Sequence, residues 1–177
     1  MTQYFGNDSI SVQDRYVYGN YDHNQISMHE RSDSENGYSG TYLMYPKDFQ
    51  DAGIMNSMRT LNIQNTPIES VNFVRDENGN KKTNGGIIQS FKVKNNTVLL
   101  DEVYRSSRSN IPIEEFKFSN TINKGLDPFM MANRTAFNKL NIDDSYENSP
   151  ITTYDTYNLS NRLTQFHNHL NYNVAYY

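Results

Sequence analysis

Four histidines, His23, His29, His167 and His169, are the side chains of this sequence best suited to acid–base chemistry near neutral pH. If a helix carries His167 and His169, two positions apart, they point about 200° away from each other and cannot share one metal ion. His23 falls in a turn and His29 precedes Glu30, without a partner in the local sequence. We interpret the histidines as polar surface residues, with a site built from His29 and a distant acid as the open alternative.

Adjacent carboxylates occur three times, at Asp101-Glu102, Glu114-Glu115 and Asp143-Asp144. Catalytic acid pairs converge across a cleft, whereas neighbours in a strand point to opposite faces. Gly85-Gly86 has neither the spacing nor the lysine of a phosphate-binding loop. The chain contains no cysteine, which excludes disulfides, thiolate zinc sites and a cysteine nucleophile. The sequence therefore predicts a non-enzymatic protein with no cofactor, no metal site and no catalytic residues.

Tyrosine and asparagine dominate the composition. The 177 residues include 14 Tyr and 9 Phe but no Trp, only 20% are charged, and about one residue in seven is Asn. Phenols and uncharged amides suit large, wet protein interfaces, although an AT-rich genome explains the asparagines equally well. A net charge of -4 gives no attraction for nucleic acid or anionic lipid.

The sequence lacks two features of exported or membrane proteins. No apolar run reaches the roughly 18 residues of a membrane span, and the start, MTQYFGNDSI, lacks a basic and an apolar signal region. We therefore expect no membrane partner and no secretory signal.

The hydrophobic pattern predicts a single α+β, mostly β domain over residues 1–177, with an antiparallel sheet or sandwich core in the first two thirds. A strand over 42–45 ends at Pro46, and imperfect alternation favours another over 58–63. Residues 69–104 read as a meander, with turns at Asn78-Gly79 and Asn95-Asn96 and a break at Gly85-Gly86.

Two helices are predicted near the C-terminus. Residues 126–144 combine Asp127 as a cap, Pro128 at the first helical position and apolar residues at helical spacing. Residues 158–173 place Leu159, Leu163 and Phe166 at steps of four and three.

The last residues, 171–177, carry three tyrosines and a valine, whereas chain ends are usually polar. We predict an extended arm that adds to a sheet or lies on a neighbouring chain, with Tyr172, Val174 and Tyr176 on one face. The predicted subunit-contact residues are Tyr16, Tyr18, Tyr21, Tyr172, Tyr176 and Tyr177. The alternative is that these tyrosines fill the protein's own core.

These observations favour a structural or assembly protein of a larger particle, in a homo- or hetero-oligomer with other protein subunits. A virion fits best, with the chain as a minor capsid or tail-type component of a virus or phage, located in the virion or in the host cytoplasm.

One stretch suggests another function. Tyr42 to Ile63 resembles the second half of a βγ-crystallin Greek key, with a strand, a proline turn, an aromatic residue and a strand at Met55–Arg59. Asn7 to Ser11, NDSIS, resembles part of the calcium loop of that family, but the loop lacks the final serine, and the motif lacks the usual glycine. The resemblance implies a stand-alone β-rich binding module, and we assign no calcium ligands from it. The alternative function is therefore a βγ-crystallin-like or jelly-roll-like module that recognises calcium or carbohydrate through its loops.

Overall fold

The computed structural model describes residues 2–5, 8–18, 23–32, 37–49, 53–116, 118, 146–147, 149–157, 163–168 and 172–175. Some of these residues are described by their backbone alone, without their side chains. They are 2–5, 8–10, 155–157, 163–168 and 172–175.

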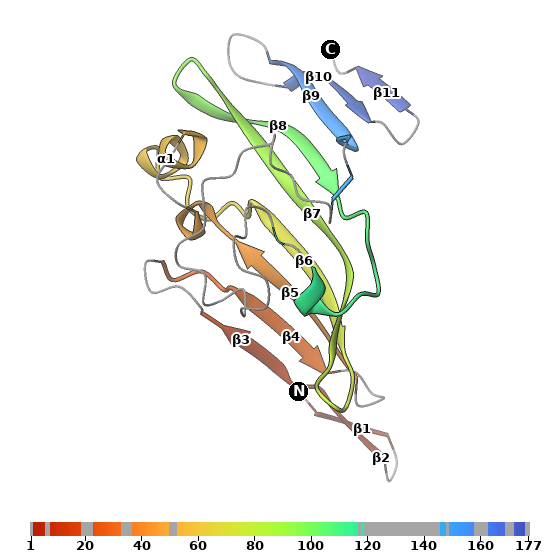
Figure 1. Ribbon diagram of the computed structural model, residues 1–177. Coiled ribbons are helices and arrows are strands. Elements are labelled where there is room, and N and C mark those ends of the chain that lie inside the picture. The colour runs from red at the N-terminus through yellow and green to blue at the C-terminus, as the bar shows by residue number, and fades with distance from the viewer. Residues whose placement is uncertain are drawn as a thin grey trace.

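The described chain is mostly antiparallel β-sheet, as predicted (Figure 1). Strands β1 (Thr2–Phe5) and β2 (Asp8–Ser11) form a separate hairpin. The other nine form one sheet: β3 (Asp14–Val17), β4 (Met28–Ser32), β5 (Tyr38–Met44), β6 (Glu69–Arg75), β7 (Lys81–Lys94), β8 (Thr97–Arg105), β9 (Thr152–Tyr157), β10 (Leu163–Asn168) and β11 (Tyr172–Ala175). Each strand pairs with its neighbours in the chain, so β3 and β11 are the two edges.

The predicted meander is confirmed over β6, β7 and β8. Gly79 has φ 87° in the first turn, and Asn95 and Asn96 have φ 50° and 56° in the second, a conformation that Gly and Asn tolerate best. The break predicted at Gly85-Gly86 is wrong, because β7 runs through it. Instead the β6–β7 register shifts between Val71 and Phe73, and Gly85 takes φ 101°, as in a β-bulge.

A helix replaces the strand predicted over 58–63. Helix α1 (Gly53–Thr60) buries Met55 and Met58, three residues apart, and places polar residues between them. This pattern fits a helical face better than a strand. The resemblance to a βγ-crystallin fails at the same place, since that fold requires a strand at Met55–Arg59. Two 3-10 turns are also present, η1 (Pro46–Asp48) and η2 (Ile113–Glu115).

The two C-terminal helices are not confirmed. The first, over 126–144, lies outside the described residues. The second, over 158–173, is wrong where the structure describes it, because residues 163–168 form β10 between β9 and β11. The leucine spacing was misleading: Thr, His, Phe and Asn are mediocre helix formers, whereas pairing on both sides satisfies the backbone of β10.

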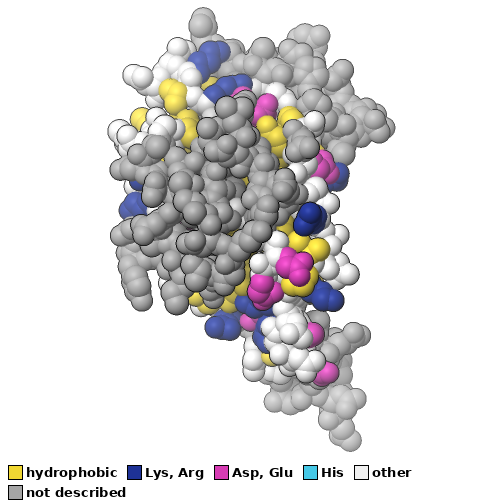
Figure 2. Space-filling model, in the orientation of Figure 1, with side chains coloured by type: hydrophobic (Ala, Val, Ile, Leu, Met, Phe, Trp, Pro, Cys, Tyr) yellow, Lys and Arg dark blue, Asp and Glu magenta, His cyan; other side chains and the backbone are white. Residues whose placement is uncertain are grey.

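The predicted sandwich is not confirmed either, because the nine paired strands form a single sheet with a hydrophobic core on one face. From the strands this core receives Met28, Tyr42, Met44, Val71, Phe73, Ile88 and Tyr104. Helix α1 adds its methionines, and later segments add Ile113, Phe116, Phe118 and Tyr146. On the side shown in Figure 2, charged side chains of both signs lie interspersed over the described surface.

Two buried carboxylates have specific partners in this core. Glu30, 1% exposed, accepts bonds from Arg75 Nε at 2.7 Å and Nη2 at 3.2 Å, and this contact raises the pKa of Arg75. Glu69, also 1% exposed, accepts a 2.6 Å bond from the Tyr146 hydroxyl. Buried carboxyl groups are costly without hydrogen-bond partners, so these contacts favour the packing of β4 with β6 and of the segment at Tyr146 with the sheet.

Gly40 lies where β5 passes beneath an aromatic ring. A Cβ at this position would lie 2.6 Å from the His29 carbonyl oxygen and would collide with the Phe73 ring. We expect Gly40→Ala to lower the free energy of unfolding by about 1–3 kcal/mol, as overpacked cores do. Urea denaturation measures this, with the exposed neighbour Ser39→Ala, expected within about 0.5 kcal/mol of wild type, as the control. Equal effects would contradict the packing.

The ionisation of Tyr104 makes the free energy of unfolding depend on pH in the alkaline range. Burial, together with the bond from its hydroxyl to Glu102 at 2.8 Å, raises the pKa of Tyr104 in the folded state. Unfolded tyrosine ionises near pH 10, so this contribution is complete below about pH 10 and is lost as the pH rises toward the folded value. We expect the free energy of unfolding to fall between about pH 10 and 12 less steeply in Tyr104→Phe than in wild type. Urea denaturation across this range tests it, and identical slopes would contradict the assignment.

Candidate protein-binding surface

Strand β3 forms one edge of the nine-stranded sheet. It pairs with β4 in the register Arg15 to Glu30 and Tyr16 to His29. The Ser32 N–H donates to the Gln13 carbonyl at 2.9 Å, which places residues 13, 15 and 17 in the hydrogen-bonded ladder positions. The N–H and C=O of Asp14 and Tyr16 therefore point away from β4, toward the side of β3 on which no described strand pairs with it.

The side chains of the same residues occupy the sheet face opposite the core. Tyr16 is 50% exposed, and Tyr18, just beyond the strand, is 58% exposed. The Tyr16 ring stacks on His29 with centroids 4.7 Å apart and planes 10° from parallel. His29 Nε2 in turn lies 2.9 Å from Asp14 Oδ1. The histidine thus holds an exposed tyrosine ring in one orientation.

A row of uncharged polar groups continues this surface across the sheet. In register, His29 faces Thr41 on β5, and Thr41 faces Asn72 on β6. The Thr41 hydroxyl donates to the Asn72 side-chain carbonyl at 2.8 Å. We call Tyr16, Tyr18, His29, Thr41 and Asn72, with the open β3 edge, the Tyr16 surface. Its Tyr, Thr and Asn composition matches that of adaptable binding surfaces.

The His29–Asp14 pair is the kind of histidine–carboxylate contact that the alternative hypothesis of an enzyme site at His29 requires. Both side chains lie on the open sheet face, 38% and 37% exposed. Catalytic pairs are normally enclosed in a pocket that excludes water. Here the carboxylate orients the imidazole, and the imidazole supports the Tyr16 ring.

His23 has a structural role in the loop before β4. Its Nδ1 accepts the Gln25 backbone N–H at 3.1 Å, and its Nε2 lies 3.1 Å from Asp48 Oδ1. Its ring packs edge-on against Tyr45. With both nitrogens engaged and the residue 8% exposed, His23 ties this loop to η1. His167 lies in β10, whose side chains fall outside the description, as does all of His169.

The acidic pairs behave as solvated or structural groups where the structure describes them. Asp101 forms an ion pair with Lys92 at 3.0 Å, while Glu102 accepts from Tyr104. Glu114 and Glu115 are exposed on η2. The pair at 143–144 lies outside the described residues. Within the described ranges, no three His, Asp or Glu side chains group as a metal site would, and no helix is long and apolar enough to cross a membrane.

The structure describes three of the six tyrosines that were predicted to contact other subunits. Tyr16 and Tyr18 are exposed, as an interface requires, whereas Tyr21, Tyr176 and Tyr177 lie outside the described residues. Tyr172 begins β11, which pairs with β10 of the chain's own sheet over residues 172–175; the side chain of Tyr172 is not described. Other tyrosines fill the core: Tyr42, Tyr45, Tyr104 and Tyr146 are 2–6% exposed.

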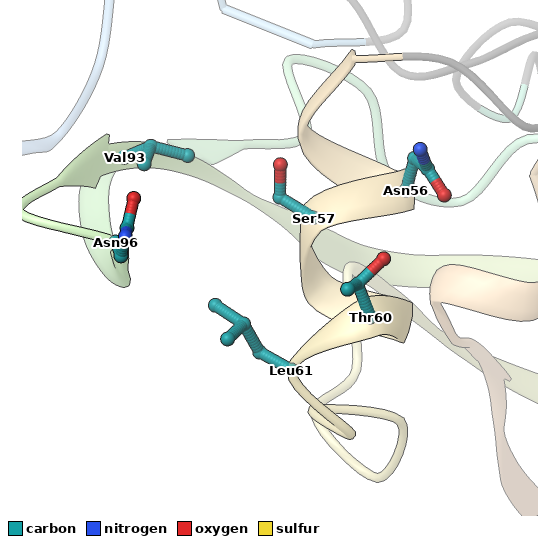
Figure 3. A pocket seen from close by; sticks show the side chains of 6 residues that line it. All are labelled: Asn56, Ser57, Thr60, Leu61, Val93 and Asn96. Atoms are coloured by element: carbon teal, nitrogen blue, oxygen red, sulfur yellow. The ribbon is translucent and has the colours of Figure 1, made fainter.

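Sequence reasoning missed a second feature, a cavity between α1 and the β7–β8 hairpin (Figure 3). Its lining residues are Asn56, Ser57, Thr60, Leu61, Val93 and Asn96. The helical spacing of Met55 and Met58 was the sequence signal for the helix that forms one wall of this cavity. The signal was missed because residues 58–63 were predicted to form a strand.

Comparison with protein-family models, with curated proteins and with solved structures finds no match.

Replacing the exposed Tyr16 and the buried Tyr42 should change the stability of the fold by very different amounts. Tyr42, 3% exposed, packs on Phe73 and accepts a 2.7 Å bond from Lys81 Nζ. We expect Tyr42→Ala to cost about 3–5 kcal/mol of stability, and Tyr16→Ala less than about 1 kcal/mol. Urea denaturation of both variants tests this. A loss of several kcal/mol in Tyr16→Ala would show that this ring serves the fold.

Proposed function

We propose that this protein is a non-enzymatic subunit of a larger protein assembly and that its Tyr16 surface contacts another copy of the chain. The observation that carries the proposal is an exposed tyrosine on an edge strand, fixed in place by His29 and Asp14. In such a contact the open backbone groups of β3 pair with an extended segment of the neighbouring subunit.

The edge geometry supports this mode of contact. Unpaired N–H and C=O groups on an edge strand are a template for another strand, and proteins usually block them with charges or a covering segment. The outward backbone groups of β3 lie at Asp14 and Tyr16, where the aspartate side chain is already bonded to His29. The added strand would therefore meet a tyrosine ring and a carboxylate that is already bonded to the His29 ring.

The fixed ring supports a contact of useful strength. A side chain that is ordered before binding loses less conformational entropy on association. Tyrosine already loses little, because it has two rotatable side-chain bonds, and the stack on His29 restricts both. Tyr16 is thus suited to act as an anchor at the centre of an interface.

The assembly that we propose is a virus or phage particle, in which this chain is a minor capsid or tail-type component. The support for this narrower statement is compositional: many tyrosines and asparagines, few charges and no cysteine. Such surfaces make broad polar contacts between subunits.

Sedimentation equilibrium from about 1 µM to 1 mM tests the contact, since this range spans weak to moderate association. We expect wild type to associate and Tyr16→Ser, which removes the ring, to raise the dissociation constant at least tenfold. Tyr16→Pro, which also removes the outward N–H, should weaken association further while leaving the β3–β4 ladder intact.

Val74→Ser is the matched control, because Val74 is 43% exposed on the same sheet face but lies on the central strand β6. It should associate like wild type. The mass of a single chain at every wild-type concentration would overturn the proposal, as would equal effects of Tyr16→Pro and Val74→Ser.

A further inference from the structure

The cavity beside α1 lies apart from the Tyr16 surface. In Figure 1, α1 lies beside the far end of the β7–β8 hairpin, while β3 is at the edge of the sheet. The cavity has a volume of about 340 Å³, near the lower limit for small-molecule pockets. It therefore has room for one side chain with its flanking backbone.

The two walls of the cavity come from segments more than thirty positions apart in the sequence. Asn56, Ser57, Thr60 and Leu61 come from α1 and the residue after it, and Val93 and Asn96 come from the hairpin. Figure 3 shows the Leu61 and Val93 side chains extending into the space between helix and hairpin, with Ser57 between them on the helix and Asn56 on the side of the helix farther from the hairpin.

The lining is uncharged and carries two exposed aliphatic groups. Leu61 is 44% exposed and Val93 is 52% exposed, although both are large hydrophobic residues. Aliphatic surface of this kind gains free energy when an apolar group covers it. Because no lining residue bears a charge, the lining offers no partner to an ionised group, which would lose hydration on entry.

The polar groups of the lining complement a peptide backbone. Each Asn side chain has one donor group and one acceptor group, the same pair that a peptide unit presents. Asn56 and Asn96 supply such amides from the two walls. The Ser57 hydroxyl is oriented toward the Gly53 carbonyl at 3.5 Å, which leaves its oxygen as an acceptor.

We propose that this cavity is a second binding site that takes an uncharged, extended peptide segment of a partner protein. An aliphatic side chain of the peptide lies between Leu61 and Val93, and its backbone amides bond to Asn56 and Asn96. The site goes beyond the proposed subunit contact and does not depend on the Tyr16 surface.

The experiment follows backbone N–H resonances of the full-length, ¹⁵N-labelled chain during titration with a blocked pentapeptide, acetyl-Gly-Asn-Val-Asn-Gly-amide. Saturable shifts are expected for Thr60, Leu61, Val93 and Asn96. The same peptide with glycine in place of valine should bind at least about tenfold more weakly, since the aliphatic contact is lost. Methyl β-glucoside, a neutral sugar, serves as the competing ligand class.

Two variants localise the site. Val93→Asp places a charge between the aliphatic walls and should weaken binding at least about tenfold. Asn96→Gly removes the amide while keeping a residue that accepts φ 56°, so the hairpin turn is retained and binding should weaken at least about threefold. Val74 is an exposed valine outside the cavity, so Val74→Asp should bind like wild type.

Several outcomes would overturn the assignment. These are the absence of saturable shifts with the valine peptide, equal binding by Val93→Asp and Val74→Asp, or shifts caused by the glucoside and not by the peptide. Loss of association in Tyr16→Pro, with peptide binding unchanged, would separate this site from the subunit contact.

Discussion

Pairing in strict chain order is the constraint on which the rest of this structure depends. In the described chain each strand from β3 to β11 pairs with the strands before and after it, so antiparallel pairing between consecutive strands satisfies the backbone, whether a short turn or a long segment joins them. A meander of this kind does not close on itself. It leaves one strand unpaired on its outer side at each end, and it leaves one face of the sheet dependent on other segments for cover. In the described chain, α1 and the segments at Ile113 and Tyr146 give that cover.

The packing of the core follows from this arrangement. Phe73 and Tyr42 lie with ring centroids 4.7 Å apart at the middle of the sheet, and Gly40 leaves the room that the Phe73 ring occupies. The two buried carboxylates of the same layer both have partners, as Glu30 bonds to Arg75 and Glu69 bonds to Tyr146. The opposite face carries Thr41, Asn72 and the Tyr16–His29 stack, which is the division of polar and apolar residues expected for a sheet packed on one side.

The sequence predicted those parts of the fold in which local chemistry decides the structure. Asn-Gly and Asn-Asn turns marked the hairpins because few other residues accept positive φ, and Pro46 marked the end of β5 because proline cannot donate to a ladder. Where tertiary contacts decide, the pattern failed. Met55 and Met58 were predicted to lie in a strand, but both are buried on one side of helix α1. The leucines after residue 158 suggested a helix, but pairing with β9 and β11 makes residues 163–168 a strand. Of the binding surface, the exposure of Tyr16 and Tyr18 was anticipated from residue type, but the support from His29 and Asp14 depends on a cross-strand register that composition does not contain.

The chain-order sheet also has a consequence for how such a protein varies. Because no strand is inserted between two others that are distant in sequence, a hairpin added or lost at either edge alters one ladder only. The central strands β5 to β8 retain their register and their shared core through such a change. A change in the number of edge strands is therefore compatible with a constant central sheet. Outer contacts could change during evolution while the hydrophobic core stays the same.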